Sequence, residues 1–272
     1  MIQITESKMS KLGWAVIGSF QIRLHSKELP LLKEIQKFFG GIGKISILSK
    51  DQSATYLVRD IKSLTNVIVP HFDQFPLQSA KKIDYELWKE CILLIANKEH
   101  LTRASFEKIV SIKGAINHGL SDKLINAFPH VKVLTRPEFI VNEEKLNPHW
   151  ISGFTSGDGS FTFSIGASIY ACYEISLHKR DKPLLLKIME FFDSKGNVRS
   201  YGAMTSAKYS ITVKSDLISL IIPHFDKNPL SGVKLHNYLI WRQMVLLLIN
   251  KAHLTPGGKV KLIELKSTLN KI

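Results

Sequence analysis

Alternating apolar and polar residues mark two related stretches of the chain. Residues 19–25 (SFQIRLH) and 173–178 (YEISLH) alternate with a period of two, which predicts half-buried strands with one face open to water. Apolar residues at helical spacing follow in residues 27–39 and 181–192, and each of these segments has a proline near its start. The pattern predicts a strand and then a helix at two places in the chain.

The elements that follow also come in matching sets. Glycines predict a turn after each helix, at residues 40–43 and at Gly196. Further strands are predicted at residues 44–48, 55–58, 197–201 and 208–213. Further helices are predicted at residues 64–72, 79–97, 217–225 and 232–250. With one more strand before the first strand of each copy, the order is β-β-α-β-β-α-α, which indicates an α+β unit with an antiparallel sheet, because hairpin-connected strands dominate.

The two sets are copies of one unit. Pro70-His71-Phe72-Asp73 reappears as Pro223-His224-Phe225-Asp226, an offset of 224 − 71 = 153 residues. At this offset, 16 of the 33 positions from 70 to 102 are identical to positions 223 to 255. A unit used twice is not a solenoid, which needs at least three shorter repeats. We therefore expect a pseudo-twofold tandem repeat with a first repeat at residues 1–128, a linker at 129–148 that is rich in proline and charge, and a second repeat at 149–272.

Composition narrows the class of partner. The chain has 272 residues, 44% of them hydrophobic, and can bury a sizeable core. Lysine and arginine exceed aspartate and glutamate by 37 − 23 = 14, which favours a nucleic acid or an anionic membrane as partner. A generally basic soluble protein is the alternative. Cys91 and Cys172 lie far apart, which indicates neither a disulfide framework nor a zinc site and favours a reducing compartment. No apolar run is long enough to predict a transmembrane helix, and the first residues resemble neither a signal peptide nor an amphipathic presequence.

One segment, residues 151–159, occurs once in this duplicated chain. It predicts a short helix that ends at glycine, with Gly153 and Gly157 on one face, where another backbone can approach closely. Asp158 would lie at the negative end of the helix dipole, where a carboxylate is unfavourable by roughly 0.3–1 kcal/mol and a cation such as Mg²⁺ would compensate. A solvated turn is the alternative. The offset maps Asp158 onto Thr5, since 158 − 153 = 5, so no second copy of this acid is expected.

Polar residues gather on one face of the predicted strands, as base recognition in a major groove requires. The candidates of the first repeat are Ser19, Gln21, Arg23, His25, Lys44, Ser46 and Arg59. Those of the second are Thr162, Ser164, Glu174, Ser176, His178, Arg199, Lys208, Ser210 and Thr212. An ordinary solvated face is the alternative.

A lysine recurs in the pattern Pro-Leu-x-x-x-Lys in each repeat. Lys81 and Lys234 are these lysines, and either could stabilise phosphate charge, unless it is a plain surface lysine. His71 and His224 follow proline in a repeated helical context, which favours packing or capping over metal binding. Trp88 and Trp241 lie in apolar helical runs and are predicted to be core residues.

The segment from Trp150 to Phe161 resembles the motif of the LAGLIDADG homing endonucleases of organellar introns, in their single-chain form with two repeats. Its glycines and its terminal Asp158-Gly159 pair carry the resemblance, while Ser156 stands where an aspartate is often found. The resemblance implies two motif helices at the centre of a pseudo-twofold protein, under a saddle of antiparallel strands that binds the major groove. It also implies Mg²⁺ held by one acid from each helix, with Asp158 as one such acid and Lys81 and Lys234 as active-site lysines.

The first repeat resembles the family from about Ile2 onwards, at the end of a first strand and a turn at residues 7–13. The resemblance thus implies that a first motif helix is missing, and Glu6, expected in the turn, is a poor substitute acid. We expect a double-stranded DNA endonuclease, encoded and located in the mitochondrion, monomeric if complete, without a membrane partner. The alternatives are a maturase that binds its host intron RNA and a DNA-binding protein that does not cut. We expect these 272 residues to bind DNA salt-dependently but to cut poorly or only nick.

Overall fold

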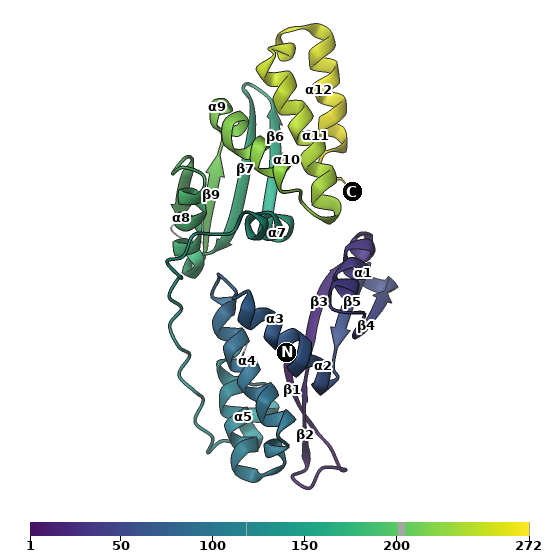
Figure 1. Cartoon of the computed structure of the whole chain (residues 1–272), viewed down its shortest axis with the longest axis vertical. Helices are drawn as coiled ribbons and strands as arrows, with labels where there is room; N and C mark the ends of the chain where they lie inside the picture. Colours follow the sequence, from purple (N-terminus) through teal and green to yellow (C-terminus); the bar gives the residue numbers. More distant parts are fainter. Residues whose placement is uncertain (118, 201–204, 272) are drawn as a thin grey trace. The chain divides into compact units, whose positions relative to one another are not determined.

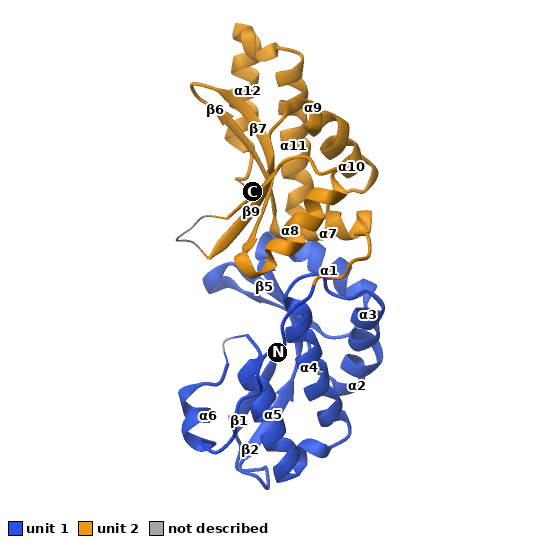
Figure 2. Cartoon of the chain, turned by 90° about the vertical axis from the view of Figure 1, so that its left-hand side faces the viewer, with its two compact units in different colours: residues 1–140 blue, residues 141–272 orange. Residues whose placement is uncertain are grey.

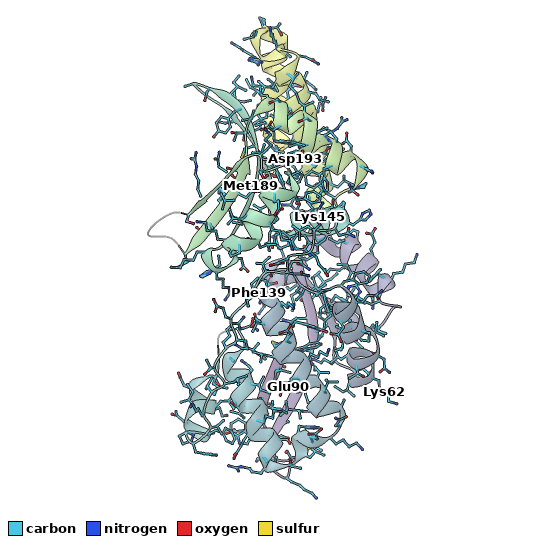
Figure 3. All side chains as sticks on the ribbon, turned by 60° about the vertical axis from the view of Figure 1, so that its left-hand side comes forward. Lys62, Glu90, Phe139, Lys145, Met189 and Asp193 are labelled. Carbon is cyan, nitrogen blue, oxygen red and sulfur yellow. The ribbon has the colours of Figure 1, made fainter. Side chains whose placement is uncertain are left out.

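The computed structural model describes residues 1–117, 119–200 and 205–271. The chain forms two compact units, residues 1–140 and 141–272, which are described separately (Figure 2). The division falls inside the segment that was predicted as a linker, and Figure 3 labels Phe139 and Lys145 on either side of it.

Unit 1 combines antiparallel strands with helices. Its elements are β1 (Ile2–Glu6), β2 (Trp14–Gly18), β3 (Phe20–His25), α1 (Leu29–Phe38), β4 (Lys44–Leu48), β5 (Ser53–Val58), α2 (Ile61–Ser63), α3 (Val69–Gln74), α4 (Lys81–Ala96), α5 (Arg103–Ala115) and α6 (Asp122–Ala127) (Figure 1). The strands β1 and β2 form a hairpin, and β3, β5 and β4 form an antiparallel sheet in that order. The hairpin and the sheet join at Ser19, between β2 and β3.

Unit 2 repeats this order after one additional helix. Its elements are α7 (Pro148–Asp158), β6 (Gly159–Ile165), β7 (Ile169–His178), α8 (Lys182–Phe191), β8 (Asn197–Ser200), β9 (Ser206–Ile211), α9 (Lys214–Asp216), α10 (Ile222–Lys227), α11 (Gly232–Ile249) and α12 (Pro256–Thr268). The four strands form one antiparallel sheet in the order β6-β7-β9-β8. The helix α11 packs against β6, β7 and α12, and Figure 1 shows the two helices side by side.

The predicted α+β tandem repeat with antiparallel sheets is confirmed. The helices α5 and α12, which begin at the same offset, 256 − 103 = 153, were missing from the predicted order. In α12, Leu262 is the one fully buried residue, so its apolar periodicity is too weak to identify the helix from sequence. Thr102 and Thr255 cap the two helices with their side chains.

Each unit has its own core beneath one face of its sheet. In unit 2, Phe161, Tyr173 and Trp241 are fully buried between the strands and the helices. Trp88 is also buried, so the prediction that both tryptophans are core residues is confirmed.

The two repeated histidines pack against aromatic rings. The ring centroids of His71 and Phe39 lie 5.1 Å apart, and those of His224 and Phe192 lie 5.4 Å apart. Burial lowers the pKa of His224 to about 4, so this ring is neutral at physiological pH. The predicted packing role is confirmed for both.

Candidate active site

The motif helix α7 is defined by its two ends. Pro148 stands in its first turn, and the Asn147 side chain accepts a hydrogen bond of 2.8 Å from the backbone N–H of His149. At the other end the chain turns into β6 at Gly159, where a Cβ would lie 2.7 Å from the carbonyl oxygen of Thr155. A glycine is therefore needed directly after Asp158, and this turn fixes the acid at the end of α7.

The buried face of α7 is held by hydrogen bonds to the rest of unit 2. The Ser152 hydroxyl donates to the carbonyl of Asn228 over 2.7 Å. The hydroxyls of Thr155 and Tyr173 also lie 2.7 Å apart, and Thr155 is fully buried. These contacts fix the position of α7 against the core of unit 2.

The face of α7 that carries Gly153 and Gly157 is open. A Cβ built on either glycine meets no atom within 4 Å, and both residues are exposed. Packing of another helix against these glycines stays a prediction.

Asp158 and Lys234 come together at the C-terminal end of α7. The Lys234 ammonium donates a hydrogen bond of 2.5 Å to the carbonyl of Gly159, the residue that follows Asp158. Burial raises the pKa of the Asp158 carboxyl, Lys234 opposes this shift, and Asp181 adds to it. Lys234 also lies in the first turn of α11, where the positive end of the helix dipole favours anions. This end of unit 2 thus offers an acid for a cation beside a positive charge for a phosphate.

Asp158 fits a divalent cation as one oxygen ligand. Its carboxylate is solvent accessible although the surrounding protein raises its pKa, and it faces the negative end of the α7 dipole. Among residues 1–117, 119–200 and 205–271, no group of three or more His, Cys, Asp or Glu side chains could hold a metal. Among these residues, Asp158 therefore does not belong to a set of three such side chains that could hold an ion.

Lys81 occupies a different environment in unit 1. Its ammonium donates to Asn117 Oδ1 over 3.0 Å and lies 3.6 Å from Asp84 Oδ2. Asp84 in turn accepts a hydrogen bond of 2.6 Å from Arg136. Lys81 and Lys234 occupy the same position in the repeat, but Lys81 lies beside a carboxylate from its own helix.

The strand register shows that the position equivalent to Asp158 in unit 1 differs from the predicted one. Gly18 pairs with Ile2, and its equivalent Ala171, 153 residues later, pairs with Phe163. The first strands are thus offset by 163 − 2 = 161 residues instead of 153, and the position equivalent to Asp158 falls at 158 − 161 = −3, upstream of the first residue. The mapping onto Thr5 was wrong because the β1-β2 hairpin is longer than the β6-β7 hairpin.

Glu6 also differs from its prediction. It is the last residue of β1 instead of a turn residue, and its carboxylate lies 2.7 Å from the ammonium of Lys123. An ion-paired Glu6 at the end of the hairpin is not positioned like Asp158.

Unit 1 has an open apolar groove where α7 lies in unit 2. Its lining includes Phe20, Phe38, His71 and Phe72, and Phe38 is 69% exposed. Phe20 is equivalent to Tyr173, since 173 − 20 = 153, and Tyr173 is one of the residues that contact α7. The groove is therefore the counterpart of the surface that α7 covers.

The predicted polar face is present in unit 1, with one exception. Gln21, Arg23 and His25 are exposed on β3, and the register aligns Gln21 with Lys44 and Arg23 with Ser46 across β5. Ser19 was predicted on the same face but is 1% exposed. The prediction for Ser19 was wrong because the alternation stops where β2 meets β3, and Gly18 and Ser19 are both buried. Arg59 is exposed but lies just beyond β5.

The residues that fix the β3 side chains come from the β4-β5 connection and from the first residue of β5. Arg23 forms an ion pair with Asp51 and donates a hydrogen bond of 3.1 Å to Ser53 Oγ. His25 Nε2 lies 3.2 Å from Gln52 Oε1. These partners were not predicted from the sequence, because the turn that carries Asp51 and Gln52 has no periodic pattern.

In unit 2 the predicted polar residues line one face of the sheet. Those on its strands are Thr162, Ser164, Glu174, Ser176, His178, Arg199, Lys208 and Ser210. The register places Glu174 opposite Ser210, and Lys208 between Ser176 and Arg199. Lys208 also forms an ion pair of 3.0 Å with Glu174. Thr212 is exposed but follows the end of β9.

The chain contains two copies of an α+β unit, and each copy has a polar face on its strands. A helix that contains two glycines and ends in an acid precedes the second copy. These features define a class of tandem-repeat protein with a motif helix. The model of the LAGLIDADG endonuclease family matches residues 1–92 and 151–245. The chain belongs to this family, as the resemblance predicted.

Relatives in fungi share the same organisation. The chain is 35% identical over 264 residues to probable intron-encoded endonuclease 3 of Neurospora crassa, a match that covers 94% of this chain and 49% of the relative. It is 31% identical over 279 residues to probable intron-encoded endonuclease 2 of the same fungus, covering 99% of this chain and 62% of the relative. The chain thus spans about half of the first relative's length and less than two thirds of the second's.

Solved structures match the whole chain. The I-SmaMI LAGLIDADG homing endonuclease bound to cleaved DNA is 34% identical, with a TM-score of 0.95 over 100% of this chain and 92% of that one. I-SmaMI bound to uncleaved DNA in the presence of calcium ions gives the same TM-score and identity, over 100% and 94%. The predicted pseudo-symmetric fold with two repeats is confirmed. Among the described residues, no helix combines the length and apolarity that crossing a bilayer requires.

Proposed function

We propose that the protein is a site-specific endonuclease that hydrolyses phosphodiester bonds of double-stranded DNA with a divalent cation. The observation that carries this proposal is the juxtaposition of Asp158 and Lys234 at the end of α7, in a unit whose sheet has a polar face. Family membership and the DNA-bound relatives support it, and they favour DNA over intron RNA as the partner.

Each part of the site has a physical role in this proposal. The polar faces contact base edges and phosphates, and the net charge of +14 strengthens binding to any duplex. The Asp158 carboxylate would hold the cation, and a bound divalent cation would supply a Lewis acid for the phosphate and lower the pKa of a bound water. The Lys234 ammonium and the N-terminus of α11 stabilise the negative charge that develops on the phosphate. Lys81 has the equivalent electrostatic role in unit 1.

The identity of the cation, the cellular location and the oligomeric state are part of the same proposal. Mg²⁺ suits the hard oxygen ligand at Asp158, and calcium accompanies one DNA-bound relative. A mitochondrial location and a monomeric protein are supported by the intron-encoded relatives and by the duplication within one chain.

The test compares the wild-type 272-residue protein with the Asp158→Asn variant. The substrate is a plasmid library with random inserts, with Mg²⁺, and sequencing of the 5′ and 3′ ends reports nicks on each strand. We expect Asp158→Asn to reduce nicking by about 100-fold or more, because the cation loses its carboxylate. DNA affinity should change little and should fall steeply with salt in both proteins. Unchanged nicking in the variant would remove Asp158 from the mechanism.

A further inference from the structure

Lys81 and Lys234 are equivalent in sequence but differ in charge environment. Asp84 lies one turn after Lys81 on α4, and its equivalent on α11, 84 + 153 = 237, is the neutral Asn237. Both residues are buried, with exposures of 7% and 6%. The two units therefore differ in charge at the buried position one turn after the lysine.

Asp84 and Asn237 share one structural role. The backbone N–H of Asn117 donates to Asp84 Oδ1 over 3.2 Å, and the backbone N–H of Asn270 donates to Asn237 Oδ1 over 3.1 Å. The two donors are also equivalent, because 270 − 117 = 153. An amide oxygen is sufficient for this contact, so the contact does not explain the charge of Asp84.

Arg136 compensates the charge of Asp84. Its guanidinium donates to Asp84 Oδ1 over 2.6 Å and to the carbonyls of Ala115 and Ala80 over 2.8 Å and 3.2 Å. Burial acts to raise the pKa of Asp84, but hydrogen bonds from Arg136 and Asn117 outweigh it and hold the pKa below its usual value. Arg136 thus anchors the segment after α6 to α4 and keeps Asp84 ionised.

Lys81 is the second cation beside this carboxylate. Its ammonium is 3.6 Å from Asp84 Oδ2 and donates a hydrogen bond to Asn117 Oδ1, and its side chain is 61% exposed. Without Arg136, the ionised Asp84 would have Lys81 as its closest counter-charge and would hold it more strongly.

We infer that Asp84 and Arg136 form a positioning pair for Lys81, in which Arg136 neutralises Asp84 and leaves the Lys81 ammonium available to a phosphate. The electrostatic part of this inference concerns unit 1 alone, and the phosphate part rests on the proposed nuclease function. The pair has no charged counterpart in unit 2, where Asn237 occupies the position equivalent to Asp84 and the carboxylate near Lys234 is instead that of Asp158.

The first test needs no nuclease activity. Lysine amines of the 272-residue protein are acylated at about pH 9 with limiting reagent, and mass spectrometry gives the rate at Lys81 relative to Lys234 in the same molecule. We expect Arg136→Gln to slow acylation of Lys81 by about threefold or more, because the uncompensated Asp84 carboxylate, 3.6 Å away, would hold the ammonium in an ion pair. The double variant Asp84→Asn/Arg136→Gln, which reproduces the neutral residue of unit 2, should restore the rate.

Two controls separate this effect from misfolding. Arg136→Lys keeps the charge and should preserve most of the wild-type rate, and thermal unfolding shows whether each variant is folded. An unchanged Lys81 rate in folded Arg136→Gln, or no recovery in the double variant, would overturn the inference.

The second test uses the nicking assay with strand-resolved products. Arg136→Gln should slow nicking of one strand more than the other by reducing kcat with little change in KM, and Asp84→Asn/Arg136→Gln should recover it. Equal slowing of both strands would contradict the inference. If the wild-type protein makes no nicks, the proposed nuclease function is wrong. The acylation rates alone then test whether Arg136 neutralises Asp84 beside Lys81.

Discussion

At the residue scale, the position of Asp158 costs stability. Its carboxylate lies at the C-terminal end of α7, where the helix dipole is unfavourable to an anion, and burial raises its pKa. A cation would remove both penalties. The acid is therefore better explained by ligand binding than by folding.

This cost can be measured in the metal-free protein. Because the folded-state pKa of Asp158 is raised, ionisation is harder in the folded than in the unfolded protein. The penalty is complete at neutral pH and disappears as pH falls below the ordinary carboxyl range of about 4. In EDTA at pH 7, Asp158→Asn should raise Tm by at most about 4 °C, because the dipole penalty is roughly 0.3–1 kcal/mol and solvent screening reduces the penalty from burial of this exposed side chain. At acidic pH the two Tm values should converge.

Asp226 provides a matched control, because its pKa is shifted in the opposite direction to that of Asp158. Although burial acts to raise its pKa, hydrogen bonds from Arg242 and Tyr238 lower it. Its ionised form therefore stabilises the fold at neutral pH, and this contribution is lost as pH falls through the lowered pKa. Asp226→Asn should lower Tm at pH 7. A decrease in Tm for Asp158→Asn as well would show that its raised pKa does not govern stability.

At the element scale, α7 is attached to its sheet by a buried hydroxyl pair. Thr155→Val keeps the shape of the side chain but leaves the Tyr173 hydroxyl without its 2.7 Å partner. Such a loss costs about 1–3 kcal/mol. We expect a lower free energy of unfolding in denaturant titrations.

The double variant Thr155→Val/Tyr173→Phe tests the pairing. It removes both polar groups, and phenylalanine already stands at the equivalent position, Phe20, in unit 1. Its stability should exceed that of Thr155→Val alone. If the loss of unfolding free energy in the double variant equals the sum of the losses in Thr155→Val and Tyr173→Phe, the two hydroxyls do not interact.

Elements with regular apolar periodicity could be predicted from sequence, and contacts between distant residues could not. The alternation in β3 and β7 correctly gave the exposed side chains, but it failed at Ser19, where β2 meets β3. The offset of 153 residues correctly paired the two lysines, but it misplaced the counterpart of Asp158, because one hairpin is longer than the other. The contact between Arg136 and Asp84 spans 52 residues and has no local pattern.

At the scale of the whole molecule, the open groove of unit 1 defines an experiment with an added helix. The offset of the first strands, 161 residues, makes Met1 equivalent to Thr162. A copy of residues 147–161 joined directly before Met1 would therefore continue β1 in register. It would also replace the Met1 amine, whose pKa burial lowers to about 6, with a neutral peptide bond.

We expect this extension to cover the groove at Phe38 and His71. Burying a few hundred Å² of apolar surface at ~25 cal/mol per Å² should raise the free energy of unfolding by several kcal/mol. It should also convert nicking into double-strand cleavage, because it supplies a second acid. A matched extension with charged residues in place of the buried Ile151 and Thr155 should give neither effect. Efficient double-strand cleavage by the 272-residue protein itself would contradict the expectation that it only nicks.

The hairpins of the two units differ in length, and this difference affects which ligand the protein would bind. The β1-β2 turn covers residues 7–13, whereas the β6-β7 turn covers residues 166–168, so one hairpin reaches farther from its sheet than the other. The exposed side chains of β3 and β7 differ as well, with Arg23 at the position equivalent to Ser176. Two such surfaces do not present the same chemistry over the same length. A double-stranded DNA that fitted both surfaces would need a different base sequence in each half. Such a DNA could bind the protein in one orientation only.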